Sequence, residues 1–175
     1  MITVIDRSGL TEYTRKFNKE VSGLAGVTVV TPSLLFIDKF YKLCDVSEPS
    51  FTEITAETLH KFFLEKIKVG EDVSNIRCWW HTHGKFSAFF SAKDLATIEN
   101  FPAGTDWLLS VVFGSNNSVK ARVDMFKPLR IETSVAVSGN FAEDSRYNIY
   151  NGYSEKFFLR KVNALALPYS LNLRK

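Results

Sequence analysis

The chain has 175 residues, of which 45% are hydrophobic and 23% charged, as is ordinary for a globular protein with one sizeable core. Its net charge of +3 comes without the clustered Lys and Arg of a nucleic-acid binder. No apolar run approaches the ~18 residues that span a bilayer, and the N-terminus lacks a signal-peptide pattern. We therefore expect no nucleic-acid or membrane partner, and Cys44 and Cys78 favour a reducing cytoplasm over a disulfide scaffold.

The N-terminal part of the chain alternates between strand and helix patterns. Residues 2–5 predict an edge strand, and residues 8–19 predict a short helix with apolar side chains at helical spacing. Residues 27–30 and 34–41 predict two further strands, separated by a Pro-Ser turn.

A second helix is predicted over residues 55–68, where apolar side chains form one stripe and Thr55 is the expected N-cap. His60 lies in this helix and is expected at the surface, without a role in a site. Residues 76–80, Ile-Arg-Cys-Trp-Trp, then predict a buried strand.

The most informative stretch follows that strand, and it holds two of the three histidines in the chain. Side chains at i and i+2 of a strand point to the same face, so His81 and His83 are expected to project together. Zinc takes nitrogen and oxygen ligands, and Asp94 offers a carboxylate as the third. The stretch therefore predicts one zinc ion held by His81, His83 and Asp94.

Ser91 and Asp94 also resemble a capping box at the start of a helix over residues 92–100. The loop 84–90 would turn the chain back, so that Asp94 faces the two histidines. Each half has an ordinary explanation, since a His-x-His pair occurs by chance and a Ser/Asp pair often only caps a helix. The combination behind a buried strand favours a metal site.

The C-terminal half is predominantly β in pattern. We expect a central strand at 107–114, a turn at 115–118, a hairpin partner at 119–126, further β-structure at 131–137 and a helix at 155–165.

Phe86, Phe89 and Phe90 lie in the loop between the histidines and Ser91. Core packing beneath the site is the favoured interpretation of these rings, and an apolar wall of a substrate groove is the alternative.

The string His81-Thr82-His83-Gly84, six residues, then Ser91-Ala92-Lys93-Asp94 resembles the motif of the JAMM (also JAB or MPN+) metalloprotease family. Members carry H-[ST]-H-P, six residues and S-x-x-D, so Gly84 stands where the family has proline. The aromatic residues around the motif are similar to those of prokaryotic members, some of which are encoded beside ubiquitin-like activating and conjugating enzymes.

The family also has an upstream glutamate before a glycine-containing strand. By this resemblance the glutamate is Glu20, in Glu-Val-Ser-Gly-Leu-Ala-Gly, with the second glycine one position early. Glu12 is the nearest rival and lacks the glycine context.

The resemblance implies an α/β (mixed α+β) fold, a cytidine-deaminase-like mixed β-sheet flanked by helices. It implies one domain over residues 1–175, with a core at 1–135 and a C-terminal extension at 136–175. It also implies a zinc isopeptidase that cleaves an amide at the C-terminus of a ubiquitin-like protein or its conjugates. Glu20 would be the general base, and Ser91 would stabilise the oxyanion.

Three alternatives stay open. The chain could be a phage or bacterial zinc peptidase with another peptide substrate, a non-catalytic MPN-type scaffold, or a metal-free binding module whose histidines only pack.

Overall fold

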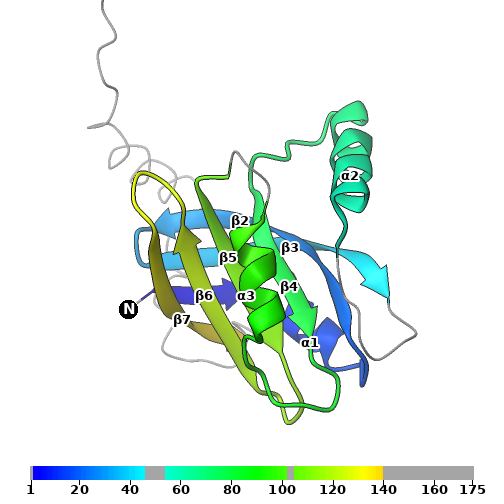
Figure 1. The fold of residues 1–175 in the computed structure, drawn as a ribbon, viewed down its shortest axis with the longest axis vertical. Helices are drawn as coiled ribbons and strands as arrows, with labels where there is room; N and C mark the ends of the chain where they lie inside the picture. Colours follow the sequence, from blue (N-terminus) through cyan, green and yellow to red (C-terminus); the bar gives the residue numbers. More distant parts are fainter. Residues whose placement is uncertain (1, 46–53, 102–104, 140–175) are drawn as a thin grey trace, which may run out of the picture. The chain divides into compact units, whose positions relative to one another are not determined.

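A computed structural model of the protein describes residues 2–45, 54–101 and 105–139, which fall within one compact unit, Met1–Asn140. This part of the chain forms strands and three helices (Figure 1). Their bounds are β1 Thr3–Asp6, α1 Leu10–Thr14, β2 Val21–Thr31, β3 Leu34–Asp45, α2 Ala56–Lys68, β4 Ile76–Thr82, α3 Ala92–Glu99, β5 Trp107–Phe113, β6 Val119–Met125 and β7 Ile131–Gly139. The helix predicted at 155–165 and most of the expected extension 136–175 lie outside the described residues.

The strands form a closed barrel in the order β1-β3-β2-β4-β5-β6-β7, so the expected α/β sheet flanked by helices is wrong. The closing element is β1, which pairs in parallel with both β3 and β7. Thr3 is level with Leu34 on one side and with Ala136 on the other, so the predicted edge strand has no free edge. Closure satisfies the backbone groups that an open sheet would leave at its margins.

The interior of the barrel is filled by apolar side chains from every strand. Its largest member is Trp80 of β4, which is fully buried and donates a hydrogen bond from Nε1 to the Leu24 carbonyl at 3.0 Å. A Cβ on Gly23 of β2 would lie 2.8 Å from the Trp80 ring, so only glycine fits beside it. The buried residues of this interior core are Val4, Leu10, Val21, Ala25, Val27, Leu35, Ile37, Cys78, Trp80, Leu109, Val111, Phe113, Ala121 and Val123.

A second apolar cluster lies outside the barrel and joins residues of α2 and α3 with residues of β2, β4 and β5. In Figure 1, α3 lies in front of the sheet at β4 and β5. Leu59 of α2 and Ile98 of α3 pack here with Trp79 of β4. The predicted N-cap of α2 is confirmed, because the Thr55 side chain accepts a hydrogen bond from the Thr58 amide. His60 is exposed, as expected.

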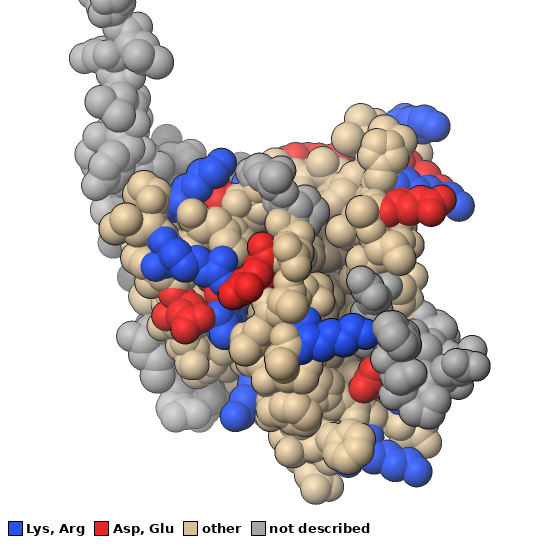
Figure 2. All heavy atoms as spheres, viewed as in Figure 1, with Lys and Arg blue, Asp and Glu red and all other residues tan. Residues whose placement is uncertain are grey.

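The predicted strand at 107–114 is confirmed as β5, which lies between β4 and β6. The hairpin to β6 is also confirmed, and Asn116 and Asn117 in its turn adopt positive φ angles, as type I′ turns require. No helix among the described residues is long and apolar enough to cross a membrane. Basic and acidic side chains are interspersed on the face in Figure 2.

Candidate metal centre

The outer face of β4 carries the first of the candidate ligands. His81 is the penultimate residue of the strand and lies on the same face as Trp79, whose ring stacks on the imidazole at 4.6 Å between centroids. His83 follows the strand and is fixed by a hydrogen bond from its amide to the Phe113 carbonyl at 2.8 Å. Both histidines are buried, at 1% and 7% exposure.

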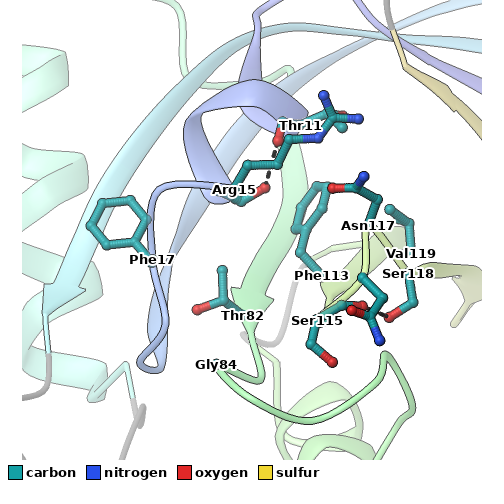
Figure 3. Close-up of a pocket in the computed structure, with 13 residues that line it drawn as sticks. Thr11, Arg15, Phe17, Thr82, Gly84, Phe113, Ser115, Asn117, Ser118 and Val119 are labelled. Carbon is teal, nitrogen blue, oxygen red and sulfur yellow. Dashed lines mark hydrogen bonds between the residues drawn. The ribbon is translucent and has the colours of Figure 1, made fainter.

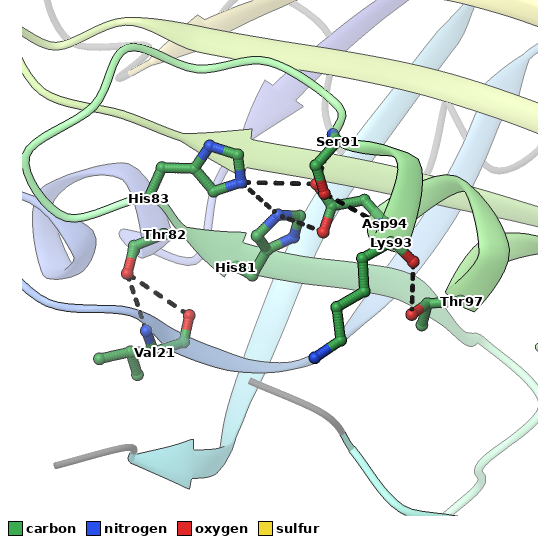
Figure 4. A network of polar contacts seen from close by, with 8 residues as sticks. All are labelled: Val21, His81, Thr82, His83, Ser91, Lys93, Asp94 and Thr97. Carbon is green, nitrogen blue, oxygen red and sulfur yellow. Dashed lines mark hydrogen bonds and ion pairs between the residues drawn. The ribbon is translucent and has the colours of Figure 1, made fainter. Parts of the chain in front are cut away.

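Three donor groups converge at this point, and they could hold a metal ion (Figure 4). Nε2 of His81 lies 3.1 Å from Nε2 of His83. The two carboxylate oxygens of Asp94 lie 3.2 Å from the His81 nitrogen and 3.5 Å from the His83 nitrogen. A tetrahedral zinc with bonds of ~2.0–2.1 Å separates its ligand atoms by about 3.3–3.4 Å. The distance between the two histidine nitrogens, and that from each histidine to one Asp94 oxygen, are close to this value. One donor atom from each residue lies within 4.8 Å of the others, so the group could hold one metal ion.

Asp94 is positioned by the first turn of α3. The Ser91 hydroxyl accepts a hydrogen bond from the Asp94 amide at 3.2 Å, and the Asp94 carboxylate accepts one from the Ser91 amide at 2.7 Å. This is the predicted capping box. Because one carboxylate oxygen binds the Ser91 amide, the side chain is held facing the two histidines.

The charge state of Asp94 suits a metal ligand. Burial alone would raise the pKa of this carboxyl, but hydrogen bonds from His81, His83 and Ser91 outweigh it and hold the pKa well below its usual range. The group is therefore ionised at neutral pH.

The backbone conformation at position 84, in the loop between His83 and Asp94, explains why the residue there is glycine. Gly84 has φ +55°, which proline cannot adopt, and a Cβ there would lie 2.7 Å from the Asn18 carbonyl oxygen. Beyond it, the loop is tied to the β5–β6 turn by hydrogen bonds from Ser115 to the Phe86 carbonyl and from Ala88 to the Ser118 hydroxyl. The departure from the motif therefore accompanies an anchored loop with a different backbone.

A small pocket of about 100 Å³ lies between α1, the loop and the β5–β6 turn (Figure 3). Thr82 and Gly84 are among the residues that line it. The Thr82 side chain points away from the two histidines (Figure 4). Thr82 donates a hydrogen bond to the Lys19 carbonyl at 2.7 Å and accepts one from the Val21 amide at 2.9 Å. These bonds fasten the chain around position 20 to the end of β4.

Glu20 lies outside the group of three ligands, immediately before β2. The ladder between β2 and β4 pairs Ser22 with His81 and ends there, so Glu20 and His83 lie just beyond the paired residues at the same end of the two strands. Glu20 is half-buried. Its rival Glu12 is exposed on α1, where it pairs with Arg15.

The favoured interpretation of the loop aromatics is wrong for two of the three. Phe86 is 70% exposed and Phe89 is 43% exposed, so neither is packed into a core. Phe89 makes an edge contact with the His83 ring at 4.5 Å between centroids. The alternative, an apolar wall beside the site, fits this arrangement better.

Two contributors were missed from the sequence. Trp79 lines a groove of about 610 Å³ between α2 and α3, and its ring also stacks on His81. Ser22 lies level with His81 on the neighbouring strand. The signal for Trp79 was its position two residues before His81 on the same strand face, whereas the neighbour of His81 across the sheet depends on strand pairing.

Comparisons with known proteins bear on the fold alone. No family model matches the chain, and no curated protein matches it. Among solved structures, the solution structure of protein DSY2949 from Desulfitobacterium hafniense is similar, with a TM-score of 0.50 and 16% sequence identity. The match covers 80% of this chain and 94% of that protein.

Proposed function

We propose that the protein is a zinc-dependent peptidase that hydrolyses an amide bond at the C-terminus of a ubiquitin-like protein. The observation that carries this proposal is the convergence of His81, His83 and Asp94, which each bring one donor atom within 4.8 Å of the others. Two nitrogens and one oxygen from the protein leave a fourth position, as catalytic zinc sites do.

Zinc bound there would lower the pKa of a water molecule to ~7 and supply a nucleophile near neutral pH. The ligand set suits this metal, because imidazole and carboxylate are among its usual donors.

Glu20 is the proposed general base. It lies immediately before β2, at the end of the strand pair where His83 follows β4, and its carboxylate would take the proton of the attacking water and deliver it to the leaving amine. Proton transfer of this kind contributes typically 10²–10⁴-fold to a rate.

Ser91 is the proposed oxyanion donor. Its hydroxyl oxygen accepts the bond from the Asp94 amide, so its own proton is not used in that bond. Ser91 would donate this proton to the oxygen that becomes negative in the transition state.

The substrate class rests on the resemblance of the His81–Asp94 string to the JAMM family motif. A ubiquitin-like tail is extended and could reach the site past the exposed rings of Phe86 and Phe89. Activating and conjugating enzymes of the same pathway would be its functional partners. A cytoplasmic location is part of the proposal and agrees with two free cysteines.

Metal content and paired glutamate variants test the proposal. We expect about one zinc per purified chain, as one catalytic site requires. Glu20→Gln should keep its zinc and cleave a ubiquitin-like fusion at least ~100-fold more slowly than the wild type. Glu12→Gln is the matched control and should cleave at the wild-type rate, since Glu12 is exposed and pairs with Arg15.

The other outcomes are equally informative. A full rate in Glu20→Gln would remove it as the base, and a chain without zinc would remove the metal assignment. Zinc without hydrolysis of any amide would indicate a non-catalytic scaffold. Cleavage of other peptides but not of ubiquitin-like fusions would indicate a zinc peptidase of different specificity.

A further inference from the structure

Polar atoms without a hydrogen-bond partner gather on the outer face of the barrel. Within the described ranges there are five buried atoms of this kind, and four belong to Ser22, Trp79, His81 and Ser110 on neighbouring strands β2, β4 and β5. Most buried polar groups in proteins are paired, because leaving one unsatisfied is destabilising. Such a concentration beside a candidate metal centre needs a physical explanation.

Two of these atoms belong to residues that face each other. Ser22 of β2 is level with His81 of β4 in the antiparallel ladder, and the exposures of these residues are 0% and 1%. Side chains in such a pair point to the same face, with Cβ atoms ~4.5–5.5 Å apart. The side chains of Ser22 and His81 therefore lie side by side on one face, and both are buried.

The role of His81 fixes which atom must donate. Its Nε2 atom faces His83 and Asp94, so as a metal ligand the ring would present its lone pair at Nε2. A neutral imidazole then carries its proton on Nδ1, where it needs an acceptor. Histidine ligands in metal sites usually donate this proton to a carboxylate, a carbonyl or water.

We propose that Ser22 is a positioning residue of the metal centre. Its Oγ atom accepts a hydrogen bond from the Nδ1–H group of His81. The bond would hold the tautomer with Nε2 free for the metal and fix the rotation of the ring. This inference rests on the metal site of the proposed function and adds a residue to it.

Ser22 also has a neighbour on its other side. Cys44 of β3 is level with Ser22, so the three side chains follow one row across β3, β2 and β4. A hydroxyl can accept one hydrogen bond and donate another. Ser22 could therefore accept a hydrogen bond from His81 and donate one to the Cys44 sulfur. Burial raises the pKa of the Cys44 thiol, while Ser22 partly lowers it.

Zinc affinity in two alanine variants tests this role. Ser22→Ala should bind zinc 10–100-fold more weakly than the wild type in competition with a chelator, the usual effect of losing such a partner. Ser110→Ala is the matched control. It removes a hydroxyl that is equally buried, but one that is level with Trp79 and not with a histidine. Its zinc affinity should stay within about twofold of the wild type, outside the range expected for a lost ligand partner.

A spectroscopic readout separates positioning from general damage. In the zinc-loaded wild type, imidazole nitrogen NMR should show His81 protonated at Nδ1, with a hydrogen-bonded proton protected from exchange. The protection should be lost in Ser22→Ala and kept in Ser110→Ala. Because the wild-type spectrum alone reports the bond, the test holds even if Ser22→Ala folds poorly.

The outcomes distinguish this inference from the proposed function. A wild type that binds zinc, with equal affinity in Ser22→Ala or an unprotected Nδ1 proton, would overturn the role of Ser22 and leave the metal centre standing. A wild type that binds no zinc would overturn both.

Discussion

Trp79 and Trp80 are adjacent on β4, yet they belong to two different regions. Trp80 points into the barrel, where its Nε1 donates to the Leu24 carbonyl and its ring packs edge-on against Tyr13 and Phe40. Trp79 points outward, stacks on His81, and its buried Nε1 has no partner among the described residues. Because side chains alternate along the strand, the indole with a hydrogen-bond partner faces the interior. The indole without one lies on the outer face, which carries the candidate metal ligands.

The difference indicates that stability depends mainly on the interior of the barrel and that the candidate site depends on its outer face. The interior receives side chains from all seven described strands, so its packing is shared by the whole barrel. The outer face packs with residues of α2 and α3, and three of its polar side chains could hold a metal ion. Changes inside should therefore cost stability, and changes outside should cost metal binding.

The largest expected effect on stability comes from Trp80→Ala. Removing a fully buried indole and its hydrogen bond should lower the free energy of unfolding by ~3–5 kcal/mol, measured by denaturant titration. Asp94→Asn is the contrasting variant. It should lose zinc while its unfolding energy stays within about 1 kcal/mol of the wild type measured without metal, because Asn still accepts the capping bond. Equal destabilisation by both changes would break the comparison.

An intermediate effect is expected at Gly84. Gly84→Ala combines a left-handed backbone, worth ~1–2 kcal/mol, with a contact of 2.7 Å to the Asn18 carbonyl. Gly70→Ala is the matched control, since Gly70 has φ +75° with nothing within 4 Å of an added Cβ. We expect Gly84→Ala to lose more unfolding energy than Gly70→Ala and also to weaken zinc binding, because the loop sets His83 against α3. Equal losses in the two variants would show that the Asn18 contact is relieved at no cost.

The smallest effect on stability is expected from Glu71. Glu71 accepts hydrogen bonds from Lys39 at 2.6 Å and from Tyr41, and pairs with Lys66 at 3.1 Å, which lowers its pKa from 4.5 to about 2. A carboxyl with a depressed folded pKa stabilises above its unfolded pKa and loses this contribution as pH falls. Glu71→Gln should therefore melt slightly below the wild type at pH 7, and the gap should close between pH 4.5 and 2.

The control for this pH dependence is Glu99→Gln at the exposed end of α3. Its melting curve should follow the wild type over the same range. A gap for Glu71→Gln that persists to pH 2 would mean that the side chain acts through packing and not through its charge.

Local patterns in the sequence predicted much of the secondary structure and part of the site. The Ser91–Asp94 capping box, the Thr55 cap and the β5–β6 hairpin all follow from interactions within a few residues, which a sequence pattern records directly. The shared face of His81 and His83 follows from the alternation of a strand in the same way.

The errors concern contacts between distant residues. Residues 2–5 were expected at a sheet edge, but β1 lies between β3 and β7, whose pairing with it no local pattern encodes. Phe86 and Phe89 were expected in a core because they are apolar, but their burial depends on which elements cover the loop.

The sequence by itself determined the donor types, their spacing along the chain and the helix start that presents Asp94, because these depend on short-range geometry. Only the tertiary structure decided that the sheet closes, that the three donors meet within hydrogen-bonding distances, and that Ser22 lies level with His81. The reason is that strand pairing joins residues some sixty positions apart, and its register is selected by the packing of whole faces and not by any one segment.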